Sequence, residues 1–167
     1  MYAPQTFAGK PAFMGWLNMW DRNVPSEKYG FAGMLTAARE GSVREGRLYQ
    51  SPVVSCAPTY KSCVTDKLCD RVTRGVVSIK ATDLESLELR LRSGGENYTE
   101  LSLCGDEWVF NRSRSGEAIV GAEKDADSLN GIRRMPCSKE KEMTITIVMD
   151  EFSVEIFEGG RALSSTI

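Results

Sequence analysis

The chain has 167 residues, with 21 Lys or Arg, 23 Asp or Glu, five Cys and no His, and its formal net charge is -2. The absence of histidine excludes Ser-His-Asp and Cys-His catalysis and every metal site that needs an imidazole. The charge gives no basic footprint for nucleic acid, and no stretch approaches the ~18 apolar residues that would span a bilayer. We therefore expect neither a nucleic-acid partner nor a membrane partner.

The first fifty residues predict a small group of strands. Residues 13–20 form a nearly continuous apolar run, which is typical of a strand covered on both faces. Two more strands are expected at 34–39 and 47–50, with a turn at Glu45-Gly46 between them. Aromatic side chains are dense here; core packing is their commoner use, and stacking on the apolar faces of sugars is the alternative. These aromatic residues are Tyr2, Phe7, Phe13, Trp16, Trp20, Tyr29 and Phe31.

Residues 55–74 show little alternation and hold three of the five cysteines, so we interpret them as a linker or short helix between two units. The number of cysteines is odd and no C-x-x-C pair occurs, which argues against a disulfide framework and a zinc ribbon. We expect free thiols in a reducing cytoplasm, since the N-terminus lacks the features of a signal peptide. The cysteines are Cys56, Cys63, Cys69, Cys104 and Cys137.

From residue 75 onward, apolar and polar residues alternate with a period of two. This is the pattern of strands that have one face in a core and the other in solvent. Glycine-containing turns at 93–96 and 158–160 separate successive strands. Short alternating strands with such turns predict a β-sandwich. The expected strands are 76–81, 87–92, 98–104, 107–111, 143–149, 152–157 and 161–165.

Two loops are candidates for chemistry. Residues 125–131 have a passing likeness to a calcium loop, but Leu129 and Asn130 stand where an oxygen ligand and a glycine are needed. A solvated loop is favoured there, and we expect no metal and no cofactor. Arg112 and Arg114 offer two guanidinium groups that could bind phosphate, although a polar hairpin is the favoured interpretation.

Six segments carry a resemblance to a known family. They are residues 2–7 (YAPQTF), 15–20 (GWLNMW), 33–40 (GMLTAARE), 46–53 (GRLYQSPV), 111–116 (NRSRSG) and 150–157 (DEFSVEIF). In this order they resemble the C-terminal part of glycoside hydrolase family 32, which contains invertases, sucrose-6-phosphate hydrolases and fructan hydrolases. The resemblance spans essentially the whole chain, with Ala38 in place of the proline of a Leu-Pro-Arg-Glu motif and Asn111 in place of an aspartate.

The resemblance implies an all-β fold, a C-terminal β-sandwich preceded by strands of an incomplete last β-propeller blade. The implied units are the blade remnant at 1–54, a linker at 55–74 and the sandwich at 75–167. The family's catalytic motifs are Trp-x-Asn-Asp-Pro, Arg-Asp-Pro and Glu-Cys, and none occurs in this sequence. No catalytic residue is therefore assigned, and the chain alone is expected to be inactive. Tyr2 and Trp16 match family positions whose rings line the fructosyl pocket, so they are the expected substrate-binding residues.

The functional hypothesis is a C-terminal fragment of a β-fructofuranosidase-type glycoside hydrolase. The full-length enzyme would hydrolyse sucrose, sucrose 6-phosphate or fructan, and the sandwich would stabilise it. The alternative is a free-standing β-sandwich module that binds carbohydrate or a protein partner, an analogy that rests on fold alone. Because an incomplete blade leaves an unpaired strand edge, we also expect a homodimer formed through residues 1–50. The alternative is that residues 1–50 fold back onto the sandwich and cover the edge themselves.

Overall fold

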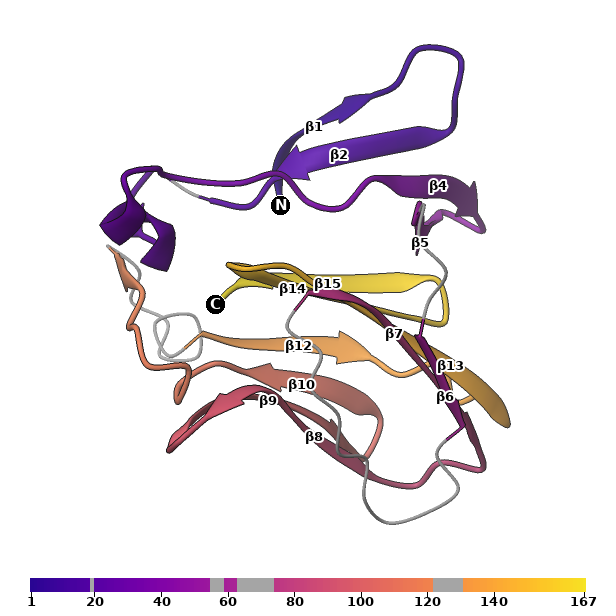
Figure 1. Cartoon of the computed structure of the whole chain (residues 1–167). Helices are drawn as coiled ribbons and strands as arrows, with labels where there is room; N and C mark the ends of the chain where they lie inside the picture. The colour runs from indigo at the N-terminus through magenta and orange to yellow at the C-terminus, as the bar shows by residue number, and fades with distance from the viewer. Residues whose placement is uncertain (19, 55–58, 63–73, 122–130) are drawn as a thin grey trace.

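The computed structural model describes residues 1–18, 20–54, 59–62, 74–121 and 131–167. Within these ranges the chain is built from β-strands and one short 3-10 helix, η1 (Pro25–Tyr29). Figure 1 shows two units, a four-stranded sheet from the first fifty residues and a sandwich of two sheets from the rest. The all-β architecture expected from the sequence is confirmed.

The first unit is one antiparallel sheet, here called the blade sheet, in the order β1-β2-β4-β5. Four antiparallel strands are the usual content of a propeller blade. The tight turn between β4 and β5 is confirmed, because Glu45 and Gly46 both have positive φ, 51° and 73°. The strands are β1 (Tyr2–Thr6), β2 (Ala12–Trp16), β4 (Arg39–Arg44) and β5 (Arg47–Pro52).

Two strand predictions in the blade sheet are wrong. The apolar run at 13–20 is not one covered strand, because β2 ends at Trp16 and the side chain of Trp20 is 71% exposed. The strand expected at 34–39 is replaced by an irregular crossing in which Leu35 makes an isolated bridge to Trp16. The regular strand β4 begins only at Arg39.

The second unit is the sandwich. One sheet has the order β12-β10-β9-β8, and the other has the order β15-β14-β13-β7-β6. All neighbours are antiparallel except β6 and β7, which are parallel. The first sheet contains β8 (Leu87–Gly94), β9 (Asn97–Cys104), β10 (Glu107–Asn111) and β12 (Ile132–Pro136). The second contains β6 (Thr59–Ser62), β7 (Gly75–Thr82), β13 (Glu142–Met149), β14 (Ser153–Glu158) and β15 (Arg161–Thr166).

The segment 55–74, expected to be a linker or short helix, contributes β6 to the edge of the second sheet. Residues 55–58 and 63–73 lie outside the described residues. The two units are also joined by a short antiparallel ladder between β3 (Arg22–Asn23) and β11 (Val120–Gly121). The exact boundaries of the units remain a prediction.

The core of the sandwich lies between its two sheets. Trp108, Phe110 and Leu101 come from the first sheet, and Ile145 and Ile156 come from the second, all with no exposed surface. Burying a side chain of this size contributes roughly 1.5–3 kcal/mol of hydrophobic free energy. The alternation seen in the sequence therefore corresponds to the inner faces of the sandwich.

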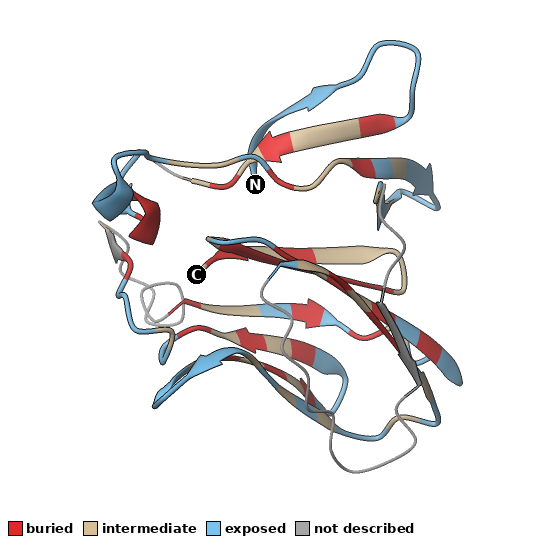
Figure 2. Cartoon of the chain, in the orientation of Figure 1, coloured by how far each residue is buried: buried red, intermediate tan, exposed pale blue. Residues whose placement is uncertain are grey.

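Strand β14 departs from the alternation rule. All six of its residues are buried, and Figure 2 shows the strand enclosed between the sandwich core and the blade sheet. Val154 and Ile156 face the core, whereas Glu155 and Phe157 lie on the other face, which the sequence predicted to be solvated. That expectation is wrong, because the blade sheet covers this face. The amide of Gln50 in β5 donates a 2.7 Å hydrogen bond to the carbonyl of Gly160.

Candidate functional site

Tyr2 and Trp16, the two residues expected to bind substrate, lie opposite each other across the first hairpin. They are register partners of β1 and β2, and their ring centroids are 6.3 Å apart at an interplanar angle of 66°. Trp20 joins them, with centroid distances of 4.9 Å to Tyr2 and 5.1 Å to Trp16. We call these three residues the ring cluster. The rings of Tyr2 and Trp20 are well exposed, so the cluster is accessible on the surface.

The crossing segment at 33–36 fixes the position of Trp16. The amide of Leu17 donates to the carbonyl of Met34 at 2.8 Å, and the amide of Thr36 donates to the carbonyl of Gly15 at 2.8 Å. Gly33 has a φ of +81°, and a Cβ atom there would lie 2.1 Å from Nε1 of Trp16. Only glycine combines this backbone angle with the space that the indole occupies.

Two other aromatic residues of the N-terminal part lie at the contact between the units. Tyr29 and Phe31 pack on Phe152 of the sandwich, with ring centroids 5.0 Å and 5.4 Å apart respectively. Five of the seven aromatic residues noted in the sequence thus lie either in the ring cluster or in the contact between the units. Exposed rings with polar edges can stack on the apolar faces of sugars, and Tyr2 and Trp20 of the ring cluster offer such a surface.

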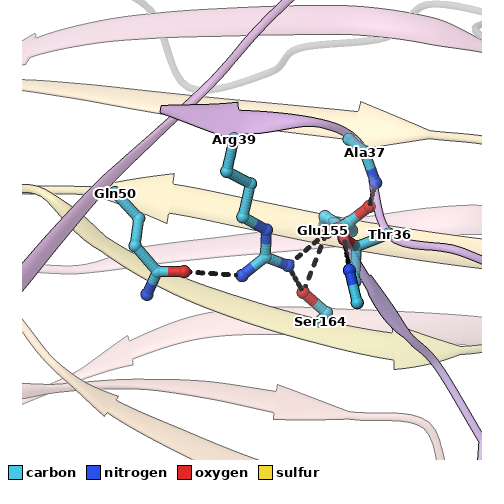
Figure 3. Close-up of polar contacts among 7 residues, drawn as sticks. Thr36, Ala37, Arg39, Gln50, Glu155 and Ser164 are labelled. Carbon is cyan, nitrogen blue, oxygen red and sulfur yellow. Dashed lines mark hydrogen bonds and ion pairs between the residues drawn. The ribbon is translucent and has the colours of Figure 1, made fainter. Parts of the chain in front are cut away.

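A buried polar network joins the two units at β4, β5, β14 and β15 (Figure 3). The guanidinium of Arg39 donates to Glu155 and Ser164, and it donates to Oε1 of Gln50 at 2.9 Å. The carboxylate of Glu155 also accepts from the amide of Ala37 at 2.5 Å and from the hydroxyl of Ser164 at 3.0 Å. We call these five residues the interunit network.

The ion pair at the centre of this network is almost completely buried. The side chains of Arg39 and Glu155 are each 3% exposed, and the guanidinium also lies over the ring of Phe157 at 5.2 Å. A buried ion pair persists only when its remaining donors and acceptors are satisfied, as most are here. Sequence reasoning missed Glu155 because it assigned that residue to a solvated face. The signal that could have revealed it is a carboxylate in the middle of the strand, placed directly between Val154 and Ile156.

The hairpin at 111–116 does not gather its two guanidinium groups. Arg112 is buried, and its Nη2 donates to the carbonyl of Glu117 at 2.7 Å. Burial lowers the pKa of Arg112, and the charge of Arg133 lowers it further, while Glu117 opposes the shift. Arg114 instead points to the surface and donates to the hydroxyl of Tyr98 at 3.0 Å. Arg112 and Arg114 therefore do not form the joint phosphate site considered from the sequence.

Among the described residues, no group of three or more His, Cys, Asp or Glu side chains could hold a metal ion. Residues 125–130 of the loop that has a likeness to a calcium loop lie outside the described residues, as do three of the five cysteines. The two described cysteines, Cys104 and Cys137, are free thiols. No helix in the described part of the chain is long and apolar enough to cross a membrane.

Comparison with known proteins gives a consistent picture. Residues 1–52 match the model of the "Glycosyl hydrolases family 32 N-terminal domain". The chain is 28% identical over 175 residues to a sucrose-6-phosphate hydrolase of Escherichia coli, a match that covers 99% of this chain and 36% of the relative. It is 30% identical over 173 residues to a raffinose invertase of Escherichia coli, again covering 99% of this chain and 36% of the relative.

Solved structures share the fold. The sucrose-6-phosphate hydrolase from Lactobacillus gasseri aligns with a TM-score of 0.71 at 15% identity, over 93% of this chain and 33% of that one. The exo-inulinase from Aspergillus awamori aligns with a TM-score of 0.67 at 18% identity, over 93% of this chain and 34% of that one. The chain thus spans about a third of the length of the proteins that it matches, 36% of each of the two Escherichia coli relatives.

Proposed function

Because the chain belongs to glycoside hydrolase family 32, we propose that it is the C-terminal part of a β-fructofuranosidase-type enzyme, in which the sandwich stabilises the last propeller blade. The interunit network carries this proposal. Its buried contacts hold the blade sheet against the outer face of β14, as a stabilising role requires. The full-length enzyme would act on sucrose, sucrose 6-phosphate or a fructan.

The chain by itself is proposed to be inactive. Retaining glycoside hydrolysis needs a carboxylate nucleophile and a carboxylic acid ~5 Å apart across the scissile bond. The sequence lacks the family motifs that supply this pair. Incubation of the purified chain with sucrose, sucrose 6-phosphate and inulin is expected to release no fructose, with a full-length family 32 invertase as the positive control. Fructose release above the blank would contradict the proposal.

Tyr2 and Trp16 are proposed to form one wall of the fructosyl pocket in the full-length enzyme. Their pairing across the hairpin, and the accessibility of the ring cluster, support this role. One wall alone should bind only weakly, so calorimetric titration of this chain with oligofructosides is expected to give no micromolar binding. Micromolar binding would instead favour a free-standing carbohydrate-binding module.

A homodimer through residues 1–50 is also proposed. Strand β1 forms one edge of the blade sheet, and all five of its residues are exposed. Large apolar side chains are exposed on the same unit, among them Leu35, Val43 and Leu48. Unpaired edges and apolar surface both favour association with another chain. Light scattering is expected to give twice the monomer mass at high protein concentration, and a monomer would contradict the dimer.

We further propose a reducing, cytoplasmic setting. The described cysteines, Cys104 at the surface and Cys137 in the core, are not joined in a disulfide, and the thiol of Cys137 lies 3.5 Å from the sulfur of Met143. Alkylation of protein taken directly from cells, followed by mass spectrometry, should find both cysteines modified as free thiols after denaturation. A disulfide involving either residue would contradict this setting.

A further inference from the structure

The sandwich has an open polar pocket that the proposed function does not use. It has a volume of about 680 Å³ and lies between the β8–β9 hairpin and the hairpin at 111–116. Its lining includes Arg90 and Arg114, the ring of Tyr98, and the polar side chains of Glu96 and Asn97. None of these residues belongs to the ring cluster or to the interunit network. We call it the hairpin pocket.

Two guanidinium groups converge on one ring in this pocket. The guanidinium carbon of Arg90 lies 4.6 Å from the ring centroid of Tyr98, and that of Arg114 lies 5.5 Å from it. One nitrogen of Arg114 donates to the Tyr98 hydroxyl at 3.0 Å, and the backbone amide of Tyr98 donates to the carbonyl of Arg114 at 2.9 Å. Contact with a common ring restrains both cations, and restraint lowers the entropy cost of binding an anion.

The ion pair of Arg90 is weak. The Nε of Arg90 lies 3.7 Å from Oε1 of Glu88, a loose pair in which both side chains are more than half exposed. Such pairs contribute little and yield readily to a better anion. A guanidinium offers five donors in a planar fork that suits the oxygens of a phosphoryl group. The sequence suggested a phosphate site formed by Arg112 and Arg114. In the structure Arg112 is buried, and Arg90 instead shares the ring of Tyr98 with Arg114.

We propose that the hairpin pocket binds a small phosphate monoester that carries hydroxyl groups. Arg90 and Arg114 hold the phosphoryl group. The carboxylate of Glu96 and the amide of Asn97, with the hydroxyls of Ser93 and Ser113, line the rest of the pocket and suit the hydroxyls of the ligand. Binding here does not depend on fructosidase activity, and it can be measured whether or not the proposed function holds.

Calorimetric titration of the 167-residue chain at low ionic strength tests the proposal. Fructose 6-phosphate is the hydroxyl-bearing probe, inorganic phosphate is the minimal one, and fructose and gluconate are the neutral and carboxylate comparisons. Fructose 6-phosphate is expected to bind more tightly than inorganic phosphate and gluconate, and fructose is expected to give no heat. Absence of binding by both phosphate probes, or gluconate binding as tightly as fructose 6-phosphate, would overturn the proposal.

Variants locate the binding. Arg90→Gln and Arg114→Gln should each weaken the affinity for fructose 6-phosphate about tenfold, since each removes charge-assisted hydrogen bonds. Arg114→Lys should lose less affinity, because lysine keeps the positive charge but lacks the planar set of donors of the guanidinium. Arg44→Gln is the matched control, since Arg44 also lies over a tyrosine ring, that of Tyr49 at 5.4 Å, but belongs to the blade sheet. Unchanged affinity in both pocket variants, with the fold confirmed by thermal unfolding, would overturn the assignment.

Discussion

Arg39 and Glu155 are 116 residues apart in the sequence, yet they form an ion pair with each side chain only 3% exposed. The pair joins β4 of the blade sheet to β14, the strand of the sandwich that is buried on both faces. A buried contact between residues so distant in the sequence forms only when the two units pack against each other. Its loss should therefore lower the stability of the whole chain.

Arg39→Met is expected to lower the free energy of unfolding by about 3–5 kcal/mol, because it leaves the Glu155 carboxylate buried without its cation. Urea denaturation measures the loss. The double variant Arg39→Met/Glu155→Leu removes both charges and should lose less than the single variant.

Lys28→Ala is the matched control for that substitution. Lys28 also forms an ion pair between the units, with Glu117 at 2.5 Å, but its side chain is well exposed. An exposed pair contributes about 0–1 kcal/mol, so this variant should unfold almost as the parent does. Equal losses in Arg39→Met and Lys28→Ala would show that burial of the Arg39 pair has no special importance.

Gly33→Ala is expected to destabilise the chain and to displace the indole of Trp16. The new methyl group would lie 2.1 Å from Nε1 of Trp16, at a residue whose φ is +81°. Tryptophan fluorescence should shift as the ring cluster is rearranged. Gly30→Ala separates the two effects, since Gly30 has a similar φ of +87° but nothing within 4 Å of the added atom. A matching fluorescence shift in Gly30→Ala would refute the steric explanation.

Glu158→Leu should lower the melting temperature of the chain. The Glu158 carboxylate is buried and accepts 3.1 Å hydrogen bonds from Nε1 of Trp108 and from the amide of Ser138. Each donor left unsatisfied in the interior costs about 1–3 kcal/mol. Glu107→Leu, at a half-exposed site with a 4.0 Å ion pair to Arg134, should change stability by no more than about 0.5 kcal/mol. Calorimetric scanning of the two variants compares them directly.

Val43→Glu should dissociate the proposed dimer. Val43 and Leu48 are register partners on β4 and β5, so they share one face of the blade sheet, and both are exposed. A charge placed there would be desolvated by association. Ser42→Glu puts the same charge on the opposite face of β4, because neighbouring side chains alternate. Sedimentation should find the first variant monomeric and the second dimeric; equal behaviour would place the interface elsewhere.

Local signals were sufficient to predict most of the sandwich. Strand β10 has the bounds that alternation indicated, and the turn at 158–160 holds two glycines with φ of 54° and 73°. Both signals arise within a few residues, so tertiary context does not alter them. Tyr2 and Trp16, which the resemblance singled out, pair across the first hairpin, and their role in binding stays a prediction.

The errors arose where tertiary contacts decide the outcome. The outer face of β14 has the polar-apolar pattern of a solvated strand, yet Glu155 is buried because the blade sheet supplies its partners. The crossing at 34–39 has strand-like composition, but its ladder to β2 is interrupted beyond the Trp16–Leu35 bridge. Neither the covering sheet nor the interruption can be read from a window of neighbouring residues.

Strand β14 belongs to the interior of both units, since Val154 faces the sandwich core and Glu155 faces the blade sheet. Because both units pack against this strand, the unfolding of one unit should be coupled to the unfolding of the other. The chain should melt in one cooperative transition, in which calorimetric and van't Hoff enthalpies agree. A sandwich expressed without the blade sheet would expose the unpaired carboxylate of Glu155 and the ring of Phe157 to water. This face of the sandwich would then be prone to association with other molecules.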